Sequence, residues 1–266
     1  MKNESPENLK SLFEVLKLAT PFDIAAHSIF LGYRGSIAHG TYIPNENPYS
    51  IDDRDIIGIA IPPPGYFFSL RSFEQYESMQ DKWDIVVYDF IKFIRLLTKA
   101  NPNTLQVLWT SSEFVLKGTW HYDLLHKNRY LFANKTIYKS FCGYSSDQLH
   151  KMEHTSYNGY MGQKRKQLVD KFGFDCKNAQ HLIRLLRQGI EFLRTGELLV
   201  ERPDKDELIE IKTGKWSIQK IKSEAQKLFK EMEQAHKESS LPEKPDVAAI
   251  DKLVYSILTQ HYSKLI

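Results

Sequence analysis

Two aspartates and a preceding small-residue turn constrain this chain more than any other feature of its sequence. The turn is Gly35-Ser36, and further along the chain the motif Asp53-x-Asp55 leads into the apolar run 56–61. Because alternate residues of a strand point to the same side of a sheet, both carboxylates should project together. Carboxylates that begin so apolar a strand need a partner, and their oxygens are hard ligands suited to Mg²⁺. We therefore expect a metal site here.

The turn supplies a second kind of chemistry. Glycine and serine leave backbone N–H groups open to phosphate oxygens where a helix begins. Nucleotidyl transfer requires that triphosphate charge be neutralised, and two metal ions roughly 3.5–4 Å apart do this while activating the acceptor hydroxyl. Gly35 and Ser36 are thus expected to bind nucleotide, and Asp53 and Asp55 to be catalytic ligands of Mg²⁺ or Mn²⁺.

Basic residues gather in the second half of the chain. Lys177, His181 and Arg184 recur at helical spacing, so that they form one stripe on an expected helix. A stripe of this kind is commonly a solvated helix face, but a bound triphosphate also needs several positioned cations. Nucleotide binding is the functional interpretation of the stripe. Lys164 and Arg165 are candidate RNA contacts, because tyrosines precede them in the sequence.

In this order and spacing, the motifs resemble the nucleotidyltransferases of the DNA polymerase beta superfamily, and within it the RNA repair pathway DNA polymerase beta family. The resemblance implies an NTP substrate, a divalent metal and an acceptor hydroxyl, with RNA, including tRNA, as the leading acceptor. A protein hydroxyl and a small molecule such as an aminoglycoside are the alternative acceptors. The resemblance covers most of the chain and rests on Gly35-Ser36-x-Ala38-x-Gly40, Asp53-x-Asp55-x-x-Gly58-Ile59, Asp84 to Tyr88, Lys92-Phe93, Ala100 to Asn103, Lys164-Arg165, Asp175-x-Lys177 and His181 to Leu186.

The resemblance also implies a third acidic residue on a later strand, and two aspartates compete for that role. The run 83–88 is rich in β-branched and aromatic residues, which predicts a strand. Asp84 and Asp89 fall on opposite faces of that strand, so only one can face the metals. The resemblance places Asp84 there, as metal ligand and catalytic carboxylate. Asp89 can instead cap the helix that begins at Phe90.

Three positions depart from the family pattern. Ile37 and Ile57 stand where the pattern usually has arginine, and His39 stands where it has an aromatic residue. The absence of these two arginines supports an alternative function, which is that of a binding protein rather than an enzyme. In that alternative, the chain is a binding module that keeps the fold and binds NTP or RNA without turnover.

Two other motifs carry competing interpretations. The segment 35–41 comes close to a phosphate-binding P-loop, but Gly40 occupies the position of the essential lysine and excludes it. The segment 150–154 reads H-x-x-E-H, the order of inverted zinc metallopeptidases. Its histidines would bind zinc together with Glu231 or Glu233. The simpler interpretation of that segment is a polar helix face.

Composition sets the outer limits of function. The chain has 266 residues and a formal net charge of +3, which is too small for a purely electrostatic nucleic-acid coater. Its two cysteines form no C-x-x-C motif, and its first residues lack the apolar core of a signal peptide. No apolar run approaches the roughly 18 residues of a membrane span. We expect a cytoplasmic protein without a membrane partner, and the sequence leaves its oligomeric state open.

The expected fold class is α+β. A nucleotidyltransferase domain with a short mixed sheet and helices is expected over 1–125, followed by an all-helical domain over 126–266. Asp52, in the polar stretch before the paired aspartates, is expected in a solvated turn. Strands are predicted at 29–31, 56–61 and 83–88, and helices of the second domain at 144–160, 176–195, 218–237 and 247–262.

Overall fold

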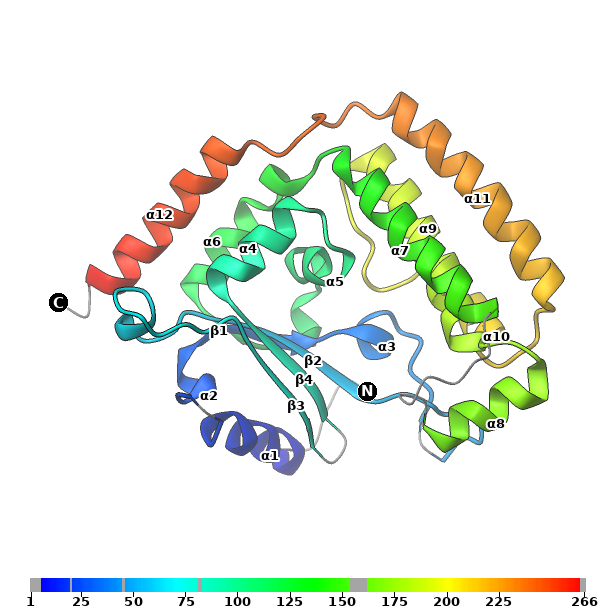
Figure 1. The fold of residues 1–266 in the computed structure, drawn as a ribbon, viewed down its shortest axis with the longest axis horizontal. Helices are drawn as coiled ribbons and strands as arrows, with labels where there is room; N and C mark the ends of the chain where they lie inside the picture. The colour runs from blue at the N-terminus through cyan, green and yellow to red at the C-terminus, as the bar shows by residue number, and fades with distance from the viewer. Residues whose placement is uncertain (1–5, 20, 45, 81–82, 154–161, 264–266) are drawn as a thin grey trace.

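A five-stranded mixed sheet forms the centre of the first half of the protein (Figure 1). The computed structural model describes residues 6–263 apart from 20, 45, 81–82 and 154–161. The strands are β1 (Ser28–Tyr33), β2 (Arg54–Ala60), β3 (Gln75–Gln80), β4 (Trp83–Asp89) and β5 (Val115–Gly118). Their order is β3-β4-β2-β1-β5, with β2 and β4 parallel and every other neighbouring pair antiparallel.

Sequence patterning predicts the three interior strands and misses both edge strands. The interior strand β1 is buried along its whole length, and β2 is buried from Ile56 onward, so their apolar runs are conspicuous. The edge strand β3 reads Q-Y-E-S-M-Q, and the edge strand β5 has only four residues. Short or polar edges are usual, because they discourage pairing with other chains. Because these edge strands are short or polar, they lack the apolar run from which a strand is predicted.

Helices cover both faces of this sheet. Those of the first half are α1 (Pro6–Lys17), α2 (Ile24–His27), α3 (Gly35–Ala38), α4 (Phe90–Thr98), α5 (Pro102–Leu105) and α6 (Trp120–Lys127). In Figure 1, α1 and α2 lie on one side of the sheet and α4, α5 and α6 on the other. Asp89 caps α4, because its Oδ2 accepts a hydrogen bond of 2.9 Å from the backbone N–H of Lys92. The capping role considered for Asp89 is thus confirmed.

After β5, the described residues of the second half form helices and connecting loops, with no further strand among them. Its helices are α7 (Thr136–Glu153), α8 (Gln163–Phe172), α9 (Cys176–Thr195), α10 (Lys205–Lys212), α11 (Ile218–Glu238) and α12 (Val247–Ser263). The predicted bounds of α9 are confirmed, whereas α7 begins earlier than expected. The continuation predicted up to residue 160 lies outside the described residues. Both α7 and α11 pack along α9, which makes α9 the centre of this half (Figure 1).

One hydrophobic cluster runs through both halves of the chain. It includes Ile57 of β2 and Leu182 of α9. The last helix, α12, returns to the first half, where the Tyr262 hydroxyl donates a hydrogen bond of 2.9 Å to the Pro62 carbonyl. The Tyr262 ring also meets the Phe67 ring edge to face. The final helix of the expected helical domain therefore lies against the expected catalytic domain.

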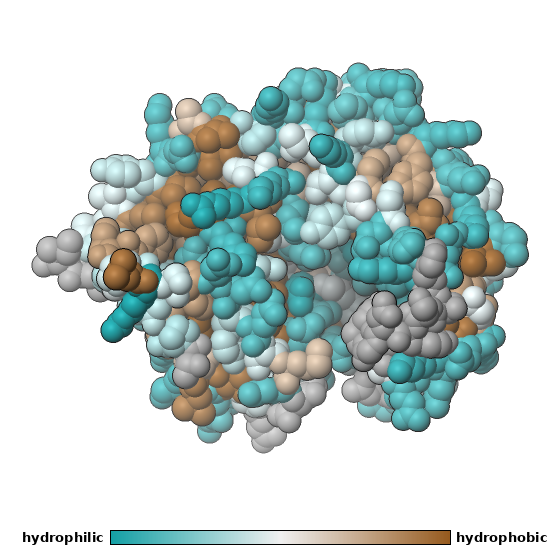
Figure 2. All heavy atoms as spheres, in the orientation of Figure 1, coloured by the Kyte–Doolittle hydropathy of each residue, from teal (hydrophilic) through white to brown (hydrophobic). Residues whose placement is uncertain are grey.

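Polar residues dominate the face of the molecule seen in Figure 2. Apolar residues gather on the side where α4, α6 and α12 lie. Within the described ranges, no helix is long and apolar enough to span a membrane. The groups with functional chemistry lie instead where α9 faces the starts of β2 and β4.

Candidate active site

Two of the three expected carboxylates lie side by side where neighbouring parallel strands begin. Asp55 of β2 and Asp84 of β4 are register partners. Arg34 lies against both, with its Nη2 3.3 Å from Asp84 Oδ2 and 4.0 Å from Asp55 Oδ1. Asp53 immediately precedes β2 and is exposed, yet its charge still acts on Asp55. All three acids therefore belong to one electrostatic group.

The Gly35-Ser36 turn is built against Asp55. Gly35 has a φ of +62°, a conformation that favours glycine. A Cβ at this position would overlap Asp55 Oδ2, so the close approach also requires glycine. The Arg34 N–H donates a hydrogen bond of 2.9 Å to the Asp55 carbonyl and ties the turn to β2. The Ser36 hydroxyl is buried and has no hydrogen-bond partner among the described residues, as expected of a group that awaits a ligand.

Burial is the largest influence on the pKa of Asp55. It raises the pKa of Asp55 to about 6, opposed by the charges of Arg34 and Lys177 and assisted by those of Asp84 and Asp53. A divalent cation would supply the missing positive charge, so this oxygen donor set fits Mg²⁺ or Mn²⁺. Within the described part of the chain, no three His, Cys, Asp or Glu side chains form a ready-made metal cluster. Arg34 occupies the space between the acids instead.

Helix α9 closes a cavity over these groups. The cavity has a volume of about 340 Å³, and its lining brings together Gly35, Asp55, His181 and Arg184. Two members of the predicted basic stripe therefore face the turn and a carboxylate rather than open solvent. This placement is the one that a phosphate-binding role requires.

Arg184 is buried and forms no ion pair with any residue that the structure describes. Its Nη1 donates a hydrogen bond of 2.7 Å to Gln188 Oε1, and its Nε has no partner among the described residues. Burial, followed by the charge of Arg202, lowers the pKa of Arg184 to about 9, so the side chain stays charged at neutral pH. Burial and the Arg184 charge lower the pKa of His181, whose imidazole is therefore uncharged. A buried guanidinium without a carboxylate is suited to binding an anion.

Lys177, the third member of the stripe, lies in a neighbouring cavity of about 280 Å³. Its Nζ donates a hydrogen bond of 3.1 Å to the Ile51 carbonyl and lies 3.9 Å from Asp52 Oδ1. Asp53 lines the same cavity. Lys177 thus reaches the segment that carries Asp53, one cavity away from His181 and Arg184.

The two candidate RNA contacts on α8 also line this neighbouring cavity, but they differ in their surroundings. Arg165 donates hydrogen bonds of 3.0 Å from Nε to Asp175 Oδ2 and from Nη2 to Asn178 Oδ1. It therefore holds the first turn of α9, where Asp175 is the N-cap. Lys164 is exposed. Of the two, Lys164 is the more accessible to an external ligand.

The expectation that Asp52 lies in a solvated turn is wrong. Asp52 is buried, and its Oδ2 accepts a hydrogen bond of 3.0 Å from the Ile43 N–H and pairs with the ammonium of Lys212. Lys212, fully buried on α10, also donates a hydrogen bond of 3.0 Å to the Thr41 carbonyl. Because Asp52 precedes Asp53, this ion pair positions the segment that delivers the acids. The sequence around Lys212 contains many charged residues, and no pattern in it indicates that this lysine is buried and paired.

The geometry gives no support to the zinc interpretation. Glu153 pairs with Lys222 of α11 at 2.7 Å, and Glu231 pairs with an arginine of α9 at 3.0 Å. His150 is exposed, and His154 lies outside the described residues. Among the residues that the structure describes, no three potential ligands gather at this place.

The fold combines a small mixed sheet with a helical region that closes over one end of it. The site combines a Gly-Ser turn with paired carboxylates. Together, these features define a nucleotidyltransferase-like fold. The chain belongs to the RNA repair pathway DNA polymerase beta family, whose sequence profile matches residues 23–256. The family resemblance seen in the motifs is thus confirmed over most of the chain. Membership supports assignment of the protein to the transferases.

One solved structure with a similar fold is a nucleotidyltransferase-like protein from Exiguobacterium sibiricum. It is 11% identical in sequence, and the match covers 88% of this chain and 75% of that chain with a TM-score of 0.32. That score is too low to support a functional argument. No curated protein matches the chain.

Proposed function

We propose that this protein transfers a nucleoside monophosphate from an NTP to an acceptor hydroxyl on RNA, with Mg²⁺ or Mn²⁺ as cofactor. The observation that carries the proposal is the cavity in which Gly35, Asp55 and Arg184 meet. It combines a turn for phosphate oxygens, a carboxylate for a divalent ion and a buried guanidinium that has no ion pair within the described ranges. The family description supports RNA as the acceptor.

Each group has a separate role in this reaction. The backbone at Ser36 and its hydroxyl, which has no partner among the described residues, bind oxygens of the triphosphate, while Arg184 contacts the same charge from α9. A metal ion held by Asp53, Asp55 and Asp84 would neutralise the triphosphate and lower the pKa of the acceptor hydroxyl. The turn and the acids thus act on the same end of the nucleotide.

The reaction joins the acceptor oxygen to the α-phosphorus and releases pyrophosphate. The side chain of Asp84 is 33% exposed, against 24% for Asp55, so Asp84 is the more accessible to an incoming hydroxyl. We propose that the Asp84 carboxylate accepts the proton of the acceptor hydroxyl. His181, held uncharged, can donate one hydrogen bond to a phosphate or sugar oxygen without adding charge.

The alternative of a binding module without turnover rests on the missing arginines. Ile37 and Ile57 are both buried in hydrophobic clusters, so their replacement of arginine is part of the core packing. Arg34 and Arg184 bring guanidinium groups to the cavity from other positions. This substitute source of positive charge favours a catalyst over a module that only binds.

The decisive experiment is incubation with each α-labelled NTP and Mg²⁺ or Mn²⁺, with and without tRNA or total RNA. We expect label in RNA, and we expect Asp55→Asn to abolish it. Label on a protein would instead identify a protein hydroxyl as the acceptor. Tight NTP binding without transfer to any acceptor would favour the binding module.

A second experiment tests the cations of α9. Arg184→Ala and Lys177→Ala should each weaken NTP·Mg²⁺ binding by roughly 1–3 kcal/mol, as loss of a charge-assisted contact does. Arg194→Ala is the matched control, because Arg194 lies on the same helix, half exposed and paired with Glu231 at 3.0 Å. Isothermal titration of the three variants measures the difference. Equal affinities of all three variants would show that Lys177 and Arg184 do not bind the nucleotide.

A further inference from the structure

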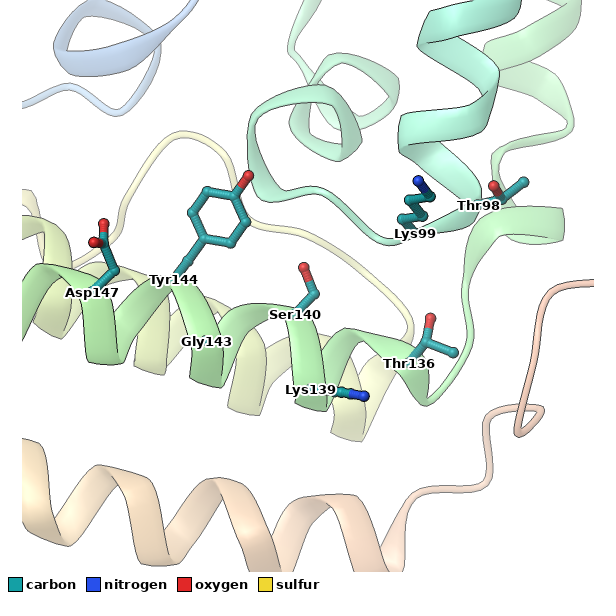
Figure 3. A pocket seen from close by; sticks show the side chains of 8 residues that line it. All are labelled: Thr98, Lys99, Thr136, Lys139, Ser140, Gly143, Tyr144 and Asp147. Atoms are coloured by element: carbon teal, nitrogen blue, oxygen red, sulfur yellow. The ribbon is translucent and has the colours of Figure 1, made fainter.

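A groove lies beside the candidate active site, between the end of α4 and one face of α7. Its volume is about 790 Å³. Figure 3 shows Thr136, Ser140 and Tyr144 extending from α7 toward the segment that carries Thr98 and Lys99. The small side chains on α7 hollow the groove, and Tyr144 marks the end nearest the active site.

The groove adjoins the active-site cavity. Tyr144 and Asp147 line both, so the same turn of α7 borders the two spaces. Asn101 Nδ2 donates a hydrogen bond of 2.6 Å to the Tyr144 hydroxyl and fixes the ring at this junction. Lys151, one turn further on, lines the cavity and pairs with Asp147 at 2.7 Å. A chain lying in the groove would therefore lead past Tyr144 toward Asp55.

The charge of the groove favours an anionic occupant. Lys99 and Lys139 are exposed, and neither forms an ion pair with a described residue. The acid Asp147 is offset by Lys151. The lining of the groove is mostly apolar, so nucleobases would contact its walls while Lys99 and Lys139 contact the phosphates. A cationic molecule such as an aminoglycoside would meet net repulsion here. Tyr144 offers a partly exposed ring on which a base can stack.

We propose that this groove receives the acceptor strand: single-stranded RNA lies along α7, with one base on Tyr144 and its reactive end in the cavity that holds Asp55. The inference rests on the proposed function, because it assigns the path by which the acceptor reaches the site. The NTP occupies the cavity under α9, where Arg184 and the Gly35-Ser36 turn lie. The two substrates thus approach the acids from different directions.

Gly143 offers a clean way to test this path. It lines the groove within α7, and an added Cβ would meet no atom within 4 Å. Gly143→Trp should fill the groove without harming the helix, because glycine is among the poorest helix formers. Gly143→Ala is the matched control, since it improves the helix and leaves the groove open. Gly65→Trp, at a remote exposed glycine with equally open space, controls for an added indole.

The measurement is the fluorescence anisotropy of a labelled single-stranded RNA of about 10 nucleotides, a length within the usual range of such sites. We expect Gly143→Trp to weaken RNA binding about tenfold or more and both controls to leave it unchanged. Affinity for a fluorescent ATP analogue should not change in any variant, and thermal unfolding should show that all three remain folded. Lys99→Glu with Lys139→Glu should also weaken RNA binding and reduce its dependence on salt.

Unchanged RNA affinity in Gly143→Trp would overturn the proposal and leave the proposed activity intact. Weaker ATP binding with unchanged RNA binding would also overturn it, because the groove would then hold part of the nucleotide. Failure of the wild type to transfer label to any acceptor would count against the proposed function alone, since the RNA titration still tests the groove.

Discussion

Replacing Asp55 by asparagine should stabilise the metal-free protein while it abolishes transfer. The pKa of Asp55 is raised from an ordinary 3.8 to about 6, chiefly by burial, so the folded chain holds this proton more tightly than the unfolded chain. At neutral pH the ionised carboxylate therefore costs up to about 3 kcal/mol of folding free energy. Asparagine keeps the shape and removes the charge. A gain of about 1–3 kcal/mol corresponds to a rise in Tm of roughly 2–8 °C for a chain of this size.

The direction of the pKa shift of Asp55 determines how the stability difference between variant and wild type changes with pH. Because the folded-state pKa lies above the unfolded value, the penalty is small below pH 3.8, develops as the pH rises, and is complete above about 6. The advantage of Asp55→Asn should therefore be largest near about pH 7.5 and fall to roughly half at about pH 5. Thermal unfolding of the wild type and variant at both pH values measures it. Added Mg²⁺ should stabilise the wild type alone, because only the wild type has the complete acid group.

Asp84→Asn is the matched comparison. It removes an acid that pairs with Arg34 at 3.3 Å, so it should leave stability unchanged or slightly reduced. If Asp55→Asn is less stable than the wild type at neutral pH, or if its advantage does not depend on pH, the account of a poorly compensated carboxylate is refuted.

Three further predictions concern residues near the site. Lys212→Ala should lower the free energy of unfolding by about 3–5 kcal/mol, because it leaves Asp52 ionised and buried, and urea denaturation measures the loss; a change within experimental error would contradict a buried ion pair. Arg34→Ala should bind Mn²⁺ several-fold more tightly than the wild type without NTP, since its guanidinium competes with the metal for the same carboxylates. Electron paramagnetic resonance measures free Mn²⁺, with Arg54→Ala as the control. The purified protein should carry no stoichiometric zinc, and His150→Ala should not change its metal content in elemental analysis.

The elements that sequence patterning predicts are those whose own residues carry the signal. The apolar strands β2 and β4 and the amphipathic helix α9 each satisfy a simple periodicity. The edge strands β3 and β5 do not, because their stability comes from pairing with a neighbour rather than from burial of both faces. Their positions depend on the sheet as a whole, which a local pattern does not contain.

The residues of the candidate site also differ in whether the sequence alone reveals them. The turn at Gly35 and the acid Asp55 form a compact local motif, so they are visible in the sequence. The buried pair of Asp52 and Lys212 joins residues 160 positions apart, and no local pattern links them. Arg34 directly precedes the turn, but its contact with Asp84 depends on the register of β2 and β4. Long-range contacts of this kind follow only from the assembled fold.

The return of α12 to the first half determines how the protein can be divided and handled. Ile250, Ile257 and Tyr262 are buried members of the cluster shared by both halves. A fragment that stops before Val247 would expose the apolar surface that these side chains cover, and a fragment that starts after residue 125 would leave α12 uncovered. Separate expression of the two halves should therefore yield aggregating products. Activity should be assayed on the continuous chain, with any affinity tag placed where it leaves α12 docked.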